Sequence, residues 1–203
     1  TLYHQRFRVF NFHLSLQYVI LEKEEAKMEN KRFLLSMLVN NEAGVLTRIS
    51  GLFARRGFNI DSLSVGETED PAISRITIMA NGDDYFKGQV VHQLEKLHDV
   101  RIVELMDLDA TVMRELLLIK VKADDQINRS QILEAVNIFR AKVIDLTPVS
   151  LTIEITGEVL KVQAFVDYLT PYGILELCRT GVTAIGRGTN ILSEKYNENK
   201  GDM

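Results

Sequence analysis

The chain has 203 residues, of which 46% are hydrophobic and 26% charged, as is usual for a globular protein. Its 24 Lys and Arg against 28 Asp and Glu give a net charge of −4, which argues against a general nucleic-acid binder, because such proteins need a basic surface. The single cysteine, Cys178, excludes an internal disulfide, and no apolar run reaches the roughly 20 residues that span a bilayer. We expect a cytoplasmic protein with no membrane and no nucleic-acid partner.

Residues 1–31 differ from the rest of the chain. Aromatic side chains crowd their first half, and a charged run from Glu22 to Lys31 follows. The acidic residues stand where a signal peptide would carry a small-residue cleavage site, so a signal peptide is excluded. We predict that these residues form an N-terminal extension. This extension is either poorly ordered or packs on the body of the protein or on a partner.

From Arg32 onward, hydrophobic periodicity predicts a first β-α-β-β-α-β unit over residues 32–110. Period-two alternation and apolar runs indicate strands at residues 32–40, 59–65, 73–80 and 100–108. Apolar stripes at helical spacing indicate one helix over 45–56 and a second helix capped by Asp83.

The same order recurs over residues 111–192. Leu117 follows Phe33 by 117 − 33 = 84 residues, and at this offset Leu133 and Val136 fall on the buried stripe of a helix. A last strand over 174–182 contains Cys178, which we expect to be a small buried hydrophobe. Residues 193–203 form a tail. We predict an α+β fold of two tandem ferredoxin-like βαββαβ domains, each with both helices on one face of a four-stranded antiparallel sheet.

The sequence lacks the common signatures of catalysis. Its four histidines form no cluster with acids or Cys178 at metal-ligand spacing, and it contains no phosphate-binding loop and no nucleophile elbow. We therefore predict a chain that is not an enzyme, with no catalytic residue, no metal site and no cofactor of its own.

The connection between the first strand and the first helix has the features of a ligand site. The N-terminus of the helix suits a carboxylate, and Gly44 would let a ligand approach the backbone. Asn41 and Asn59, which opens a second strand expected beside the first, offer amide donors and acceptors. Val45, Leu46 and Ile60 would form apolar walls. Together these groups suit a free aliphatic amino acid.

The alternative is purely structural, with Asn41 as a helix cap and Gly44 as a turn residue. The duplication favours the ligand. At the same offset Asn41, Gly44 and Asn59 become Asp125, Asn128 and Val143, so the fold alone does not require the glycine or the second amide. This comparison predicts a site in the first unit only.

Several motifs resemble those of a known family. The stretches Val39–Arg48 and Gly51–Ile60 resemble an ACT domain and, more narrowly, the regulatory (small) subunit of acetolactate synthase. The further matches are Asp70-Pro71, Ser74–Thr77, Arg114–Leu118, Ile138–Ala141, Ile144-Asp145, Thr147-Pro148 and Arg179–Gly181. The resemblance runs from about Lys31 to Leu192, and residues 1–31 depart from it.

The resemblance implies a non-catalytic subunit. Such a subunit binds and activates a catalytic subunit that carries thiamine diphosphate, Mg²⁺ and FAD, and it confers feedback inhibition by valine or a related branched-chain amino acid. The family's effector loop maps onto Asn41, Gly44, Val45 and Leu46, and Asn59 would come from the paired ACT domain of a homodimer.

Three other functions are alternatives. A stand-alone amino-acid sensor could regulate a different enzyme through the same ACT domain. An RNA-binding module shares the β-α-β-β-α-β order, but it needs aromatic residues on its central strands, and the third strands of both units have none. A small acyl-phosphate hydrolase of similar topology lacks a phosphate-cradling loop here.

Overall fold

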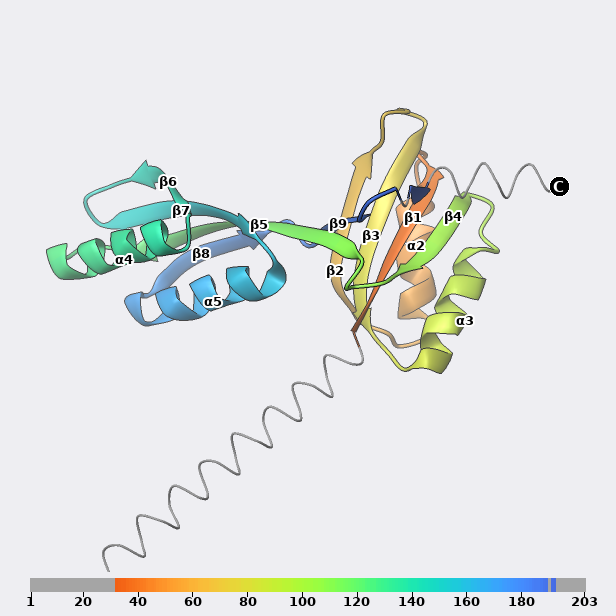
Figure 1. The fold of residues 1–203 in the computed structure, drawn as a ribbon, viewed down its shortest axis with the longest axis horizontal. Coiled ribbons are helices and arrows are strands. Elements are labelled where there is room, and N and C mark those ends of the chain that lie inside the picture. The colour runs from red at the N-terminus through yellow and green to blue at the C-terminus, as the bar shows by residue number, and fades with distance from the viewer. Residues whose placement is uncertain (1–31, 190, 193–203) are drawn as a thin grey trace, which may run out of the picture.

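The computed structural model describes residues 32–189, 191 and 192. The predictions for the N-terminal extension and for the tail lie outside the described residues. The first domain contains β1 (Arg32–Asn40), α2 (Val45–Ala54), β2 (Ile60–Glu67), β3 (Ile73–Asn81), α3 (Asp84–Leu94) and β4 (Val100–Met106). Its antiparallel sheet has the strand order β2-β3-β1-β4, and α2 and α3 cover one face of it (Figure 1).

The second domain repeats this arrangement with one addition. It contains β5 (Thr111–Lys122), α4 (Gln126–Ile138), β6 (Lys142–Leu146), β7 (Ser150–Gly157), α5 (Val159–Leu169), the 3₁₀ turn η1 (Thr170–Tyr172), β8 (Ile174–Arg179) and β9 (Thr183–Gly186). The strand order is β6-β7-β5-β8, and β9 pairs with β5. The predicted α+β fold of two βαββαβ units is confirmed.

Each domain has its own core between its sheet and its helices. In the first core, alternate residues of β1 pack against Ile49 and Phe53 of α2 and against Phe86 of α3. Asp83 caps α3 as predicted, because its side chain accepts a hydrogen bond from the amide of Phe86 at 2.8 Å. In the second core, Leu117, Ile119 and Val121 of β5 occupy the place of the first strand.

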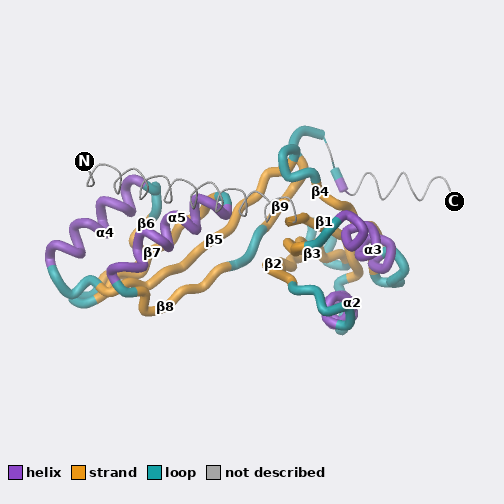
Figure 2. The backbone as a smooth tube through the Cα atoms, turned by 90° about the horizontal axis from the view of Figure 1, so that it is seen from below, coloured by secondary structure: helices purple, strands orange, loops and turns teal. Residues whose placement is uncertain are grey.

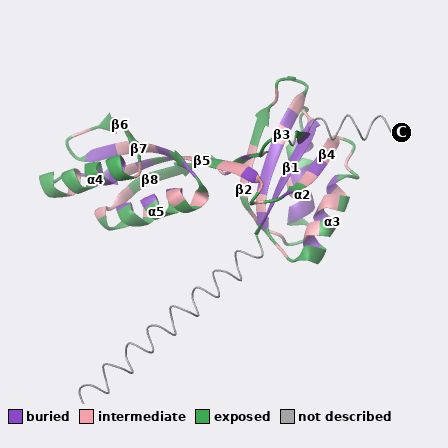
Figure 3. Cartoon of the chain, viewed as in Figure 1, coloured by how far each residue is buried: buried purple, intermediate pink, exposed green. Residues whose placement is uncertain are grey.

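A third, smaller cluster joins the two domains. It contains Leu34 and Met106 from the first domain and Val182 and Ala184 from the chain around β9. Figure 2 shows the long strand β5 reaching from the second sheet toward the first domain, with β9 beside it. Because this cluster covers part of the face opposite α2 and α3, the middle residues of β1 are buried on both sides of the sheet (Figure 3).

Three predictions about the second unit are wrong. The predicted last strand over 174–182 ends early, because β8 stops at Arg179, and an unpredicted strand, β9, follows from Thr183 along the same edge of β5. Cys178 is exposed, because it pairs with Leu118 and so shares the open face of the sheet. Leu133 is 37% exposed, because Ile132, Ala135 and Val136 form the buried stripe of α4.

None of the helices in the described part of the chain is long and apolar enough to cross a membrane.

Candidate ligand-binding site

Gly44 stands at the N-cap of α2 in the left-handed region, with φ of 88°. No side chain of the described residues caps the helix, and its first turn contains no acidic residue. A helix N-terminus presents unpaired N–H groups and a partial positive charge, so this end of α2 can bind a carboxylate. The prediction that Gly44 borders a helix N-terminus therefore agrees with the structure.

Arg48, one turn into α2, adds a positive charge beside this end of the helix. A Cβ atom built on Gly44 would stand 3.2 Å from its guanidinium nitrogen Nη1. The Nε and Nη2 atoms of Arg48 both lie 2.7 Å from Oδ2 of Asp99, which fixes the side chain. The absence of a side chain at Gly44 therefore leaves a space at the start of α2, and the Arg48 guanidinium borders this space.

Asn41 is not the helix cap that the structural alternative required. Its Nδ2 donates to Oε1 of Glu67 at 3.1 Å and to the carbonyl oxygen of Pro71 at 2.9 Å. These contacts hold the amide against the end of β2. Within the described residues, Oδ1 of Asn41 accepts no hydrogen bond, so this oxygen can accept one from a ligand.

The two predicted apolar wall residues of the loop differ in burial. Val45 belongs to the first core and is buried, whereas Leu46 is 42% exposed. Val65 of β2 is 47% exposed and lies on the same face of its strand as Leu63, which packs on the first core. Leu46 and Val65 therefore offer apolar surface near the N-terminal end of α2.

Asn59 and Ile60 lie far from this loop within the chain. The amide of Asn41 donates to the carbonyl of Ala72, at the start of β3, whereas Ile60 pairs with Ala80 at its other end. Eight residues of strand separate these points by roughly 25 Å. The expectation that β2 lies beside β1 is wrong, because β3 stands between them. One chain therefore does not bring all six predicted residues together.

In the second domain the corresponding helix N-terminus is already capped by a side-chain carboxylate. The side chain of Asp125 caps α4 by accepting from the amide of Asn128 at 2.8 Å. Nζ of Lys122 lies 2.8 Å from Oδ2 of Asp124, and this contact lowers the pKa of the Asp124 carboxyl. Asp125 thus stands where the first domain has Gly44 and an uncapped helix, and Asp124 precedes it in the chain.

Four residues were not predicted for this site from the sequence: Glu67, Val65, Arg48 and Asp99. Glu67 and Asp99 are distant in sequence from the loop, and no local pattern marks them. Val65 could have been found from its period-two spacing to Leu63. No group of three or more His, Cys, Asp or Glu side chains that could hold a metal occurs in the described part of the chain.

Comparison with known proteins places both domains in one family. Residues 35–102 match the family model described as an AHAS small subunit-like ACT domain, and residues 114–188 match the model of the small subunit of acetolactate synthase. The junction between β4 and β5 falls between the two matches.

Individual relatives match along most of the chain. A probable acetolactate synthase small subunit of Methanothermobacter thermautotrophicus is 46% identical over 82% of this chain and 99% of its own length. The acetolactate synthase small subunit of Mycolicibacterium smegmatis is 50% identical over 76% of this chain and 90% of its own. The crystal structure of the small subunit from Thermotoga maritima, 43% identical, covers 79% of this chain and 99% of its own, with a TM-score of 0.73. The chain belongs to the family of acetolactate synthase small subunits.

Proposed function

We propose that this chain activates an acetolactate synthase catalytic subunit in the cytoplasm and makes it sensitive to valine or another branched-chain amino acid. The thiamine diphosphate, Mg²⁺ and FAD of the reaction belong to that catalytic partner. The observation that carries the effector site is the uncapped N-terminus of α2 at Gly44, next to the Asn41 amide. The second domain has the same fold and a capped helix at this position.

The chemistry of the loop fits each part of a zwitterionic amino acid. The carboxylate binds the N–H groups at the start of α2, where the helix dipole favours negative charge and Nη1 of Arg48, whose other two nitrogens contact Asp99, faces Gly44. The ammonium group donates to Oδ1 of Asn41, with the Glu67 carboxylate as its counter-charge. The branched side chain packs on Leu46 and Val65, which are exposed in the free chain.

The site is completed by a second copy of the chain. Among the described strands β2 pairs only with β3, so its other edge is unpaired. If two copies of β2 pair in antiparallel fashion about their centres, Ile60 of the second copy lies opposite Glu67, and Asn59 follows it. This arrangement brings Asn59 and Ile60 to Asn41, which contacts Glu67. It also removes an exposed sheet edge.

Inhibition then follows from a linked equilibrium. Valine inhibits only if it binds the inhibited arrangement of the complex more tightly than the active one. A coupling free energy of about 1–3 kcal/mol corresponds to a 5- to 150-fold change in affinity. The dimer supplies two such sites at its boundary, and both contain residues of β2.

Reconstitution tests this function. The catalytic subunit of the same organism is assayed for acetolactate formation alone, with the chain, and with the chain plus valine, leucine or isoleucine. We expect the chain to raise the rate and one of the amino acids to reverse the increase. A rate that is the same with and without the chain would contradict the proposal. If the chain still binds an amino acid in that case, the result would favour a stand-alone amino-acid sensor that regulates another enzyme.

A further inference from the structure

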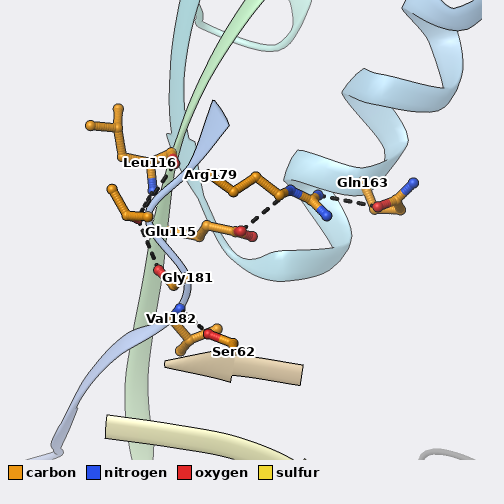
Figure 4. Close-up of polar contacts among 8 residues, drawn as sticks. Ser62, Glu115, Leu116, Gln163, Arg179, Gly181 and Val182 are labelled. Carbon is orange, nitrogen blue, oxygen red and sulfur yellow. Dashed lines mark hydrogen bonds and ion pairs between the residues drawn. The ribbon is translucent and has the colours of Figure 1, made fainter. Parts of the chain in front are cut away.

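The segment Arg179–Val182 connects the second domain to the first, and we call it the crossing segment. It separates β8 from β9 along the edge of β5, where its residues 180–182 lie opposite residues 115 and 116. The extra residue makes a β-bulge, and Gly181 adopts φ of 79° in it. Figure 4 shows polar contacts on both sides of this bulge.

On the side of the second domain, side chains fix the crossing segment. Nε of Arg179 lies 3.3 Å from Oε1 of Glu115, which is only 5% exposed, and Nη2 donates to Oε1 of Gln163 in α5 at 3.1 Å. The amide of Thr180 donates to the carbonyl of Leu116, whose own amide donates to Oγ1 of Thr180, both at 3.1 Å. The segment therefore moves with β5 and α5.

On the side of the first domain, two serines of β2 hold the same segment. The amide of Val182 donates to Oγ of Ser62 at 2.7 Å, and Oγ of Ser64 donates to the carbonyl of Val182 at 2.6 Å. Gly181 packs so tightly here that a Cβ atom would lie 2.6 Å from Oγ of Ser62. Val182 itself is buried in the third cluster, with Leu34 and Met106.

The two serines stand next to the residues that complete the proposed effector site. The pairing of β2 with β3 shifts register between Ile60 and Ser62, so a second bulge lies between the site and the serines. Asp61 in this bulge accepts hydrogen bonds from Nδ2 of Asn59 and Nδ2 of Asn81. Because Ser62 follows this bulge in the chain, a shift of Asn59 or Ile60 would also shift the backbone at Asp61 and Ser62.

We propose that Ser62 and Ser64 are positioning residues that couple the amino-acid site on β2 to the second domain through the crossing segment. The inference rests on the proposed function, because it assumes an effector at β2. It adds that occupancy of the site is transmitted by the two hydrogen bonds to Val182, and that the orientation of the second domain is what the effector changes.

The test separates binding from inhibition. In the double variant Ser62→Ala/Ser64→Ala, both side chains that hold Val182 are lost, whereas the backbone edge of β2 and the loop at Gly44 are unchanged. We expect valine affinity of the isolated chain within about threefold of the wild type and activation of the catalytic subunit to persist. The valine concentration for half-inhibition of the complex should rise at least fivefold. Ser130→Ala, which removes an exposed hydroxyl of α4, is the matched control and should leave inhibition unchanged.

A pair of glycine variants examines the crossing segment itself. Gly181→Ala introduces a Cβ against Ser62, whereas Gly188→Ala introduces one at a similar φ of 67° with nothing within 4 Å. We expect Gly181→Ala to weaken valine inhibition of the complex without weakening valine binding to the chain. Gly188→Ala should change neither inhibition nor binding. Equal effects of the two variants would show that only backbone strain matters and would overturn the inference.

Hydrogen exchange of the wild-type chain provides a measurement that needs no variant. Saturating valine should change the exchange rate of the amides in residues 180–184, and the double variant should exchange the Val182 amide faster with or without valine. Unchanged exchange in this segment, or a double variant inhibited like the wild type, would overturn the inference while leaving the effector site intact. A wild-type chain that binds none of valine, leucine and isoleucine would instead refute the proposed function.

Discussion

At the scale of single residues, Gly44 has the largest role in the proposed site. Its φ of 88° is unfavourable for residues with a side chain, by about 1–2 kcal/mol, and its missing Cβ leaves space in front of Arg48. Both features fit the proposed site, because a carboxylate bound at the start of α2 would occupy the space that the missing Cβ leaves. The sequence comparison set Gly44 against Asn128 of the second domain, whereas the structure places Asp125 at the corresponding N-cap of α4.

Replacing Gly44 by Asp should abolish feedback while activation survives. The new carboxylate would stand where the carboxylate of the effector binds, and like charges repel. We expect valine affinity, measured by calorimetry, to fall at least tenfold. Gly44→Ala carries the same backbone strain without the charge, so it should lose less affinity. A Gly44→Asp variant that remains fully valine-sensitive would show that the site lies elsewhere.

At the scale of elements, β2 combines several functions. Its unpaired edge is available to a second copy, its first residues are candidate ligands, and Ser62 and Ser64 contact the crossing segment. An edge strand with half-exposed apolar residues such as Val65 favours association. The proposed dimer and the proposed site therefore depend on the same strand.

Val65→Lys tests this dependence. In the proposed register residue 65 lies opposite Ser62 of the second copy, so the two lysines would stand on either side of the dimer axis, where like charges repel and an edge lysine disfavours strand pairing; the dimer should weaken by about 1 kcal/mol. We expect sedimentation to show a rise in the dimer dissociation constant, and valine binding to weaken with it, since Asn59 of the second copy is lost. Val149→Lys is the control, because Val149 is similarly exposed in the second domain. A valine-binding monomer would contradict the two-chain site.

The sequence predicted those features of the elements that depend on local pattern. The bounds of β1, the cap at Asp83 and the α+β topology all follow from periodicity and capping chemistry. The pairing partners of β2, the exposure of Cys178 and the contact of Asn41 with Glu67 depend on register across the sheet. No local pattern specifies that register, so these features required the structure.

Across the whole molecule, the junction contains an ion pair that is buried on one side. The Glu115 side chain of β5 is 5% exposed, whereas that of its partner Arg179 is 31% exposed. Removing Arg179 leaves a buried carboxylate without its cation, which costs about 2–3 kcal/mol, less than breaking a fully buried pair. The pair therefore makes the crossing segment sensitive to substitution even though Arg179 lies far from the effector site.

Arg179→Leu should accordingly lower the free energy of unfolding by about 2–3 kcal/mol in urea titrations. The double variant Arg179→Leu/Glu115→Leu removes both charges and should recover a large part of the loss. Arg114→Leu is the control, because Arg114 and Glu158 form an exposed pair 3.6 Å apart, and this variant should change stability little. Equal losses in Arg179→Leu and Arg114→Leu would refute a special role for the pair of Arg179 and Glu115.

The binding of a branched-chain amino acid at the start of α2 in the first domain is best tested by a calorimetric titration of the folded dimer with valine, leucine and isoleucine in turn. We expect saturable heat from at least one of them, with one molecule bound per chain and none at the second domain. A folded dimer that gives no heat with any of the three would contradict this expectation.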